Sequence, residues 1–146
     1  MLSHNSGVRM KHFSLIIAFF SLLLSSCAEQ QIANSPPSTY ELKQNYPNPF
    51  TDSTVVEYGV PYVEPNSAAP WIRVVVLDRF NQKQAILVDN GAHPAGRFKA
   101  TWYAEGVNGF TVSPGVYYIE LQQINLSGPS LGEDVFTLLR IAALKQ

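Results

Sequence analysis

The chain has 146 residues, which is room for one domain, and 46% of them are hydrophobic against 14% charged. Its formal net charge is −1, and once Arg9 and Lys11 of the leader are set aside, eight basic residues face eleven acidic ones. This balance leaves no basic footprint for nucleic acid, which excludes that class of partner. Ten prolines and nine glycines favour short strands joined by turns over helices.

Residues 1–26 are predicted to be a targeting segment that takes no part in the fold. After the basic residues comes an apolar stretch, Phe13 to Leu24, which is shorter than the ~20 residues that span a bilayer. The stretch ends in Leu24-Ser25-Ser26-Cys27, which resembles the lipobox of bacterial lipoproteins. That resemblance implies cleavage before Cys27, acylation of Cys27, and attachment of the chain to a membrane. The alternatives are an ordinary secretory peptide with a chance cysteine, or an uncleaved signal anchor.

Residues 27–41 are polar and contain Pro36-Pro37 but no hydrophobic periodicity. They are predicted to form a flexible, lipidated tether that lets the domain stand off the membrane. Cys27 is the only cysteine, so a disulfide framework is excluded.

The motif that follows, residues 46–50, opens the predicted domain of residues 42–146. Two prolines remove two backbone donors, so the motif cannot be a central strand. Its two aromatic residues are predicted to seal one end of the fold, the alternative being an exposed recognition peptide. The motif reads Tyr46-Pro47-Asn48-Pro49-Phe50.

Three segments with period-two hydrophobicity are predicted to be strands with a buried face, and a weaker one at 82–88 is predicted to be an edge strand. The inward residues are Val56, Tyr58 and Val60 in 54–60; Ile72, Val74 and Val76 in 71–78; and Phe98, Ala100 and Trp102 in 97–102.

The segment 115–121 is predicted to be the central strand, with Tyr117, Ile119 and Leu121 inward and Glu120 on the wetter face. The last segment, 135–144, is predicted to close the sheet, and a helix is the alternative. Together these segments predict an all-β fold: an immunoglobulin-like, two-sheet antiparallel sandwich of six or seven strands.

Residues for catalysis are sparse. His93 is the only histidine outside the leader and is predicted to lie solvated in a turn, with no second histidine or free thiol for a metal site or a nucleophile–base pair. Asp78 ends a strand, where aspartate usually accepts hydrogen bonds from turn amides. We therefore expect no enzyme activity, no cofactor and no metal.

The ordered series of motifs resembles the type A C-terminal sorting domain of the Bacteroidota type IX secretion system, which is similar to the immunoglobulin-like domain of flagellar hook-capping proteins. Departures include Asn81 at a usual turn glycine, Gln84 at a usual aliphatic position and Tyr103 at a usual acidic one. The residues that carry the resemblance are Tyr46, Pro47, Asn48, Pro49, Phe50, Asp78, Gly96, Trp102, Gly115, Tyr117 and Lys145.

Three functions stay open. The first is a lipid-anchored module at the outer membrane or cell surface that binds other envelope proteins through the loops 61–70, 88–96 and 122–134. If successive strands run in alternating directions, these loops gather at one end, away from the tether. That orientation reverses if residues 42–45 form one more strand across the sheet. The second is a sorting signal read by the secretion machinery, as the resemblance implies. The third is a carbohydrate-binding sandwich that uses Trp71, Tyr62 and Tyr118. The residues predicted to cluster at the loop end are Glu64, Asp89, His93, Glu133 and Asp134.

Overall fold

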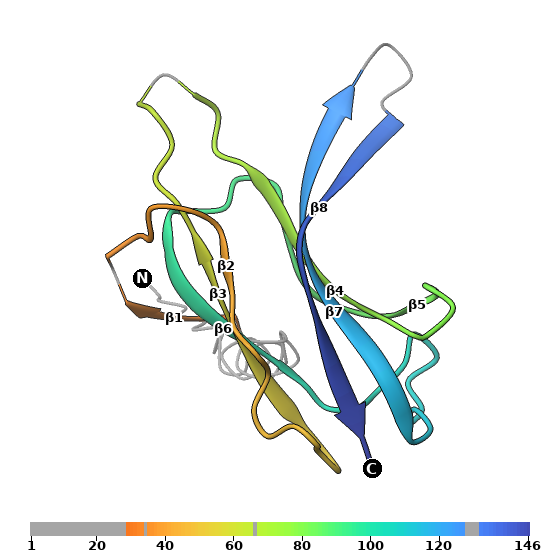
Figure 1. The fold of residues 1–146 in the computed structure, drawn as a ribbon. Helices are drawn as coiled ribbons and strands as arrows, with labels where there is room; N and C mark the ends of the chain where they lie inside the picture. The colour runs from red at the N-terminus through yellow and green to blue at the C-terminus, as the bar shows by residue number, and fades with distance from the viewer. Residues whose placement is uncertain (1–28, 34, 66, 128–131) are drawn as a thin grey trace, which may run out of the picture.

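The structure, a computed structural model, describes residues 29–33, 35–65, 67–127 and 132–146. Within these residues it is an all-β sandwich without a helix (Figure 1). The leader and the predicted lipidation residues Leu24, Ser25, Ser26 and Cys27 lie outside the described residues. The strands are β1 (Gln30–Ala33), β2 (Glu41–Leu42), β3 (Thr54–Val60), β4 (Trp71–Leu77), β5 (Lys83–Asn90), β6 (Gly96–Trp102), β7 (Gly115–Ser127) and β8 (Gly132–Lys145).

The strands form two sheets of four, and every pair of neighbours is antiparallel. The first sheet has the order β1-β6-β3-β2 and the second the order β5-β4-β7-β8. The predicted two-sheet sandwich is therefore confirmed, and the predicted weak strand, β5, lies at an edge as expected. The strand count exceeds the predicted six or seven because β1 and β2 were not predicted.

The core lies between the sheets and consists of the residues that strand periodicity assigned to it. The inward side chains of β3, β4 and β6 are all at most 3% exposed, and Ile119 and Leu121 of β7 are fully buried. Trp102 lies at the centre of an aromatic row, with ring centroids 5.3 Å from Phe50 and 5.1 Å from Tyr117. Burial of these rings removes a large apolar area from water, which is the main stabilising term of such a fold.

The last two strands form one long hairpin, so the predicted helical alternative for 135–144 is wrong. Residues 115–127 pair with 132–145 along their length, with one bulge after Leu121. The predicted loop 122–134 is therefore mostly strand. The end of β7 and the start of β8 lie at the end of the molecule opposite the C-terminus (Figure 1).

The outer face of β7 differs from the prediction at Glu120. This side chain was expected on the wetter side, but Glu120 is only 5% exposed. Its Oε2 accepts hydrogen bonds from Gln122 Nε2 at 2.7 Å and from Thr137 Oγ1 at 3.0 Å. Neighbouring long side chains on a flat sheet cover it, and single-strand periodicity carries no information about such cover.

The segment predicted as a tether belongs to the sandwich from Glu29 onward. Its first strand, β1, pairs with β6, and its second, β2, pairs with β3. The chain then runs beside β3 as far as Tyr46, whose backbone pairs with Val55. The additional pass left open in the sequence is thus present. Strands of only two and four residues are too short to show a period of two in the sequence.

The sandwich has two distinct ends. At one, which we call the acidic end, lie residues 61–65 and 67–70, the turn 91–95, the end of β7 and the start of β8; at the other lie the β4–β5 turn, the loop 103–114 and the C-terminus (Figure 1). Among the described residues no helix is long and apolar enough to cross a membrane.

Candidate functional site

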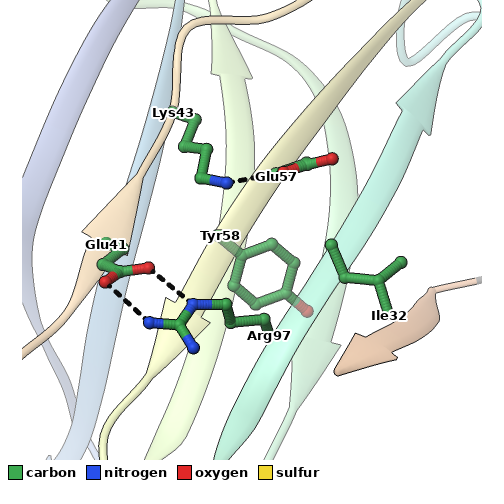
Figure 2. Close-up of a pocket in the computed structure, with 6 residues that line it drawn as sticks. All are labelled: Ile32, Glu41, Lys43, Glu57, Tyr58 and Arg97. Atoms are coloured by element: carbon green, nitrogen blue, oxygen red, sulfur yellow. Dashed lines mark hydrogen bonds and ion pairs between the residues drawn. The ribbon is translucent and has the colours of Figure 1, made fainter. Parts of the chain in front are cut away.

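One surface hollow, too small to admit a water molecule, lies on the outer face of the first sheet beside β1 and β2, and its charged groups are paired with one another (Figure 2). Within it Lys43 Nζ lies 2.9 Å from Glu57 Oε2, and Arg97 Nε lies 3.1 Å from Glu41 Oε2. The hydrogen bond from Arg97 lowers the pKa of Glu41, and the same bond raises the pKa of Arg97. In the described part of the chain no group of three His, Cys, Asp or Glu residues could hold a metal ion.

Among the described residues His93, which was predicted to be solvated, is one of the most buried polar side chains. It is 1% exposed, and its ring packs edge-on against Phe98 at 4.6 Å. Its backbone N–H donates to Pro70 O at 2.9 Å, which joins the turn 91–95 to the preceding loop. The prediction of a solvated turn histidine is therefore wrong, because the turn folds inward between the ends of the two sheets.

Glu29 binds this histidine. Glu29 Oε1 lies 2.7 Å from His93 Nε2 and accepts a hydrogen bond from Tyr58 Oη at 2.6 Å. His93 Nδ1 lies 2.8 Å from the carbonyl of Pro94, which can only accept, so Nδ1 carries a proton. A proton must also lie between Nε2 and the carboxylate, since two bare acceptors would repel at 2.7 Å.

The electrostatics favour the charged carboxylate. Burial opposes ionisation of Glu29, but the hydrogen bonds from His93 and Tyr58 outweigh it, and the pKa of Glu29 is lowered. Burial, with Glu29 beside it, raises the pKa of Tyr58 far above its usual range. The hydrogen bonds to His93 and Tyr58 thus attach Glu29, the first described residue, to the core. Neither Glu29 nor Tyr58 was predicted here, and a polar residue in an aperiodic segment gives no signal of such a contact.

Of the residues predicted for the loop end, two meet on the outer face of the second sheet. Arg73 donates to Asp89 Oδ2 at 3.1 Å and to Glu133 Oε2 at 3.0 Å. Trp71 Nε1 donates to the other oxygen of Asp89 at 2.5 Å. The hydrogen bond to Glu133 is the main cause that raises the pKa of Arg73.

The other three predicted residues lie apart from this cluster. His93 is buried, Glu64 is exposed in the loop 61–70, and Asp134 pairs with Asn125 near the tip of the β7–β8 hairpin. Their binding role stays a prediction.

The motif of residues 46–50 holds the C-terminal strand. Phe50 N donates to Leu144 O, and Gln146 N donates to Phe50 O, both at 2.9 Å. The side chain of Asn48 accepts from Leu144 N at 2.8 Å and donates to Ala142 O at 3.2 Å. The peptide bonds preceding Pro47 and Pro49 are cis. Of the two aromatic residues predicted to seal this end, Phe50 is buried as expected, but Tyr46 is 81% exposed.

The remaining motif residues have structural surroundings. Asp78 Oδ1 accepts from the amides of Phe80 and Gln82, as expected for a strand-end aspartate. Asn81 adopts φ 60°, which asparagine tolerates better than most residues. Gly96 begins β6 with φ 151°, Gly115 pairs with Lys145, and that lysine is buried.

No protein-family model matches the chain, and no curated protein matches it. Among solved structures it is similar to dimeric latent PorU from Porphyromonas gingivalis, with 16% sequence identity over 77% of this chain and a TM-score of 0.50. The chain spans 10% of that protein's length. At this identity the likeness concerns the fold alone, and it agrees loosely with the immunoglobulin-like sandwich described above.

Proposed function

We propose that this chain is a non-catalytic envelope protein, anchored to a membrane through acylated Cys27, whose sandwich serves surface display or secretion by binding other proteins. The anchor rests on the lipobox resemblance of residues 24–27. The single structural observation that supports the proposal is the position of Glu29. Its side chain is bound to the buried His93, so the chain joins the sandwich two residues after the proposed lipid.

Metabolic palmitate labelling combined with protease treatment of intact cells tests the proposal. We expect label on the wild-type protein and none on Cys27→Ala, and we expect external protease to remove the wild-type protein from intact cells. Equal labelling of both proteins, or none on either, would contradict the anchor. Full protection from protease in intact cells, with digestion after lysis, would contradict surface display.

A second candidate is a type IX sorting signal, and one observation favours it. The family-like motif of residues 46–50 binds the backbone of residues 142–146 through four hydrogen bonds, so the C-terminal strand is held in a fixed place. Secretion machinery that reads a folded surface needs such a strand in a defined position. Deletion of residues 135–146 would not test this candidate cleanly, because it would remove the pairing partner of β7 and unfold the sandwich.

The better test of the sorting signal changes the exposed side chains of β8 and leaves its pairing intact. Val135 and Phe136 are exposed, so V135S/F136S should keep the fold. If the chain is a sorting signal, wild type should remain inside cells that lack a working type IX machinery, and V135S/F136S should reach the surface less in normal cells. Unchanged export in both cases would remove this candidate.

The carbohydrate alternative gains no support from its three rings. Trp71 and Tyr118 lie on the same face of the second sheet but at opposite ends of the β4–β7 ladder. The face of Tyr118 is covered by the Arg140 guanidinium at 4.0 Å, and Tyr62 lies in the loop after β3. These rings do not form one platform for a sugar.

A further inference from the structure

The loop between β6 and β7 carries a small hairpin that exposes apolar side chains. Gly106 N donates to Phe110 O and Val112 N donates to Ala104 O, at 2.9 and 2.8 Å, and Glu105 pairs with Thr111. Gly109 has φ +76°, a conformation that glycine adopts without strain. Trp102 Nε1 donates to Glu105 O at 2.9 Å and so joins the hairpin to the core.

The apolar residues of this hairpin point into solvent although its backbone is well bonded. Val107 is 70% exposed, Phe110 73% and Tyr103 63%. Phe80, in the neighbouring β4–β5 turn, is 68% exposed, with the Arg79 guanidinium 4.7 Å from its ring centroid. We call Phe80, Tyr103, Val107 and Phe110 the apolar end. Large apolar side chains gathered at one end of a small domain are typical of a surface that contacts a partner.

The hairpin packs beside β5, the strand that follows the β4–β5 turn. A Cβ placed on Gly106 would lie 3.4 Å from Gln84 Oε1, so the start of β5 touches the hairpin. A hollow of ≈ 380 Å³ runs between them and is lined by residues of both, among them Ile86, Tyr103 and Val107. Arg79 and Lys83 flank Phe80 in sequence, Asp78 lies in the same turn, and Glu105 is the one charged residue within 103–114. Exposed aromatic and aliphatic side chains of this kind match the interface of a membrane.

The direction of β1 relates this end to the proposed anchor. Because β1 is antiparallel to β6, with Gln30 opposite Lys99 and Ala33 opposite Arg97, the first residue of β1 lies nearer to Trp102, from which the hairpin leaves, than its last residue does. Cys27 precedes Glu29 by two residues, so chain length keeps it within about 7 Å of that residue. Since His93 and Tyr58 fix Glu29, the anchor cannot stand far from the sandwich.

We infer that the apolar end is a membrane-docking surface: Phe110, Val107, Tyr103 and Phe80 enter the interface of the bilayer that holds acylated Cys27. This inference rests on the proposed function for the anchor. It implies that the domain lies on the membrane with its acidic end outward, and it replaces the predicted stand-off tether. The occupant is a lipid surface, because the covalent anchor delivers that surface to this side of the molecule.

The first arm of the test uses the acylated full chain in vesicles of phosphatidylethanolamine and phosphatidylglycerol. F110C is labelled with an environment-sensitive fluorophore, and Y62C, an equally exposed position in the loop 61–70, is the matched control. We expect a blue-shifted emission and quenching by nitroxide lipids for F110C only. Equal emission from both positions, with palmitate incorporation proved on the same sample, overturns the inference and leaves the anchor standing. Shielding of F110C in native envelopes but not in lipid vesicles also overturns it, in favour of a protein partner.

The second arm uses the unacylated C27S chain, so that membrane binding by the apolar end is measured without the lipid anchor. We expect V107S/F110S to reduce binding to the same vesicles at least about tenfold, through lost apolar contact, while Y62S leaves binding unchanged. All three replaced side chains are exposed, so far-ultraviolet circular dichroism should show the same fold for all variants. The inference is overturned if V107S/F110S and Y62S bind the vesicles equally. It is also overturned if the C27S chain does not bind and Cys27 of the wild-type chain incorporates no palmitate.

Discussion

The two ends of the sandwich expose opposite kinds of side chain. The acidic end carries Asp89 and Glu133 around Arg73, with Trp71 bonded to the same cluster. The apolar end carries Phe80, Tyr103, Val107 and Phe110, and the rings of Phe50 and Trp102 lie directly behind it in the core. At the acidic end, the charged side chains at the surface are paired with one another. At the apolar end, a hydrogen-bonded backbone keeps apolar side chains exposed to water.

This difference shows which end depends on a partner. An exposed ion-pair network is stable in water and gains little from further contact. Exposed aromatic side chains gain free energy only when another surface covers them. The proposed anchor adds the direction, because the first residue of β1, Gln30, lies nearer to the apolar end than its last residue, Ala33.

The largest effect is expected where the apolar end joins the core. W102A should lower the free energy of unfolding by about 3–5 kcal/mol, because it removes a buried ring that contacts Phe50 and Tyr117. W71A, at the acidic end, should cost only about 1 kcal/mol, mainly the hydrogen bond to Asp89. Urea unfolding followed by circular dichroism measures both, and equal losses would contradict the contrast between the two ends.

The next effect concerns the contact that holds the start of the chain. E29Q should lower the free energy of unfolding by about 1–2 kcal/mol at pH 7, because a charge-assisted hydrogen bond to His93 is lost. Since the pKa of Glu29 is lowered in the folded protein, its stabilisation is present above the unfolded value of 4.5 and is lost as the pH falls through the folded pKa.

The difference between wild type and E29Q should therefore shrink as the pH is lowered from 7 toward 2. Urea unfolding at several pH values measures this difference. E57Q, which alters an exposed pair with Lys43, is the control and should change little at any pH. A difference that stays constant across this range would show that Glu29 stabilises the fold by packing alone.

A smaller effect is expected at the C-terminal strand. N48A should cost about 1 kcal/mol, since it removes the acceptor of Leu144 N and the donor to Ala142 O. N48D keeps the acceptor and should retain protection of the Leu144 amide. Hydrogen exchange followed by NMR distinguishes the two variants. Equally fast exchange of the Leu144 amide in both would show that Asn48 stabilises the strand through the hydrogen bond that it donates to Ala142 O.

The smallest effect is expected at the acidic end. R73M should change the free energy of unfolding by at most about 1 kcal/mol, because Asp89 and Glu133 are partly exposed and screened by water. The difference should decrease further in 1 M salt. Thermal unfolding at low and high salt measures it, and a loss several times larger would mean that the cluster supports the fold and is not a free surface.

Hydrophobic periodicity was sufficient to predict which residues of the central strands are buried. In β3, β4 and β6 each predicted inward residue is buried, because both neighbours of an interior strand enforce the alternation of its faces. The same rule failed for Glu120, which neighbouring side chains cover on the outer face, and for the aperiodic strands β1 and β2. The predicted meeting of Asp89 with Glu133 followed from strand order alone, but Arg73 as the residue that joins them did not.

The sequence by itself determined the sandwich, its core rings and the lipobox-like start, since each of these depends on residues close together in the chain or on a repeating pattern. Only the tertiary structure decided that His93 is buried on Glu29 and that the motif of residues 46–50 holds the C-terminal strand. These contacts join residues separated by 64 to 96 positions, and the cooperative packing of both sheets offsets their cost in chain entropy, which no local pattern records.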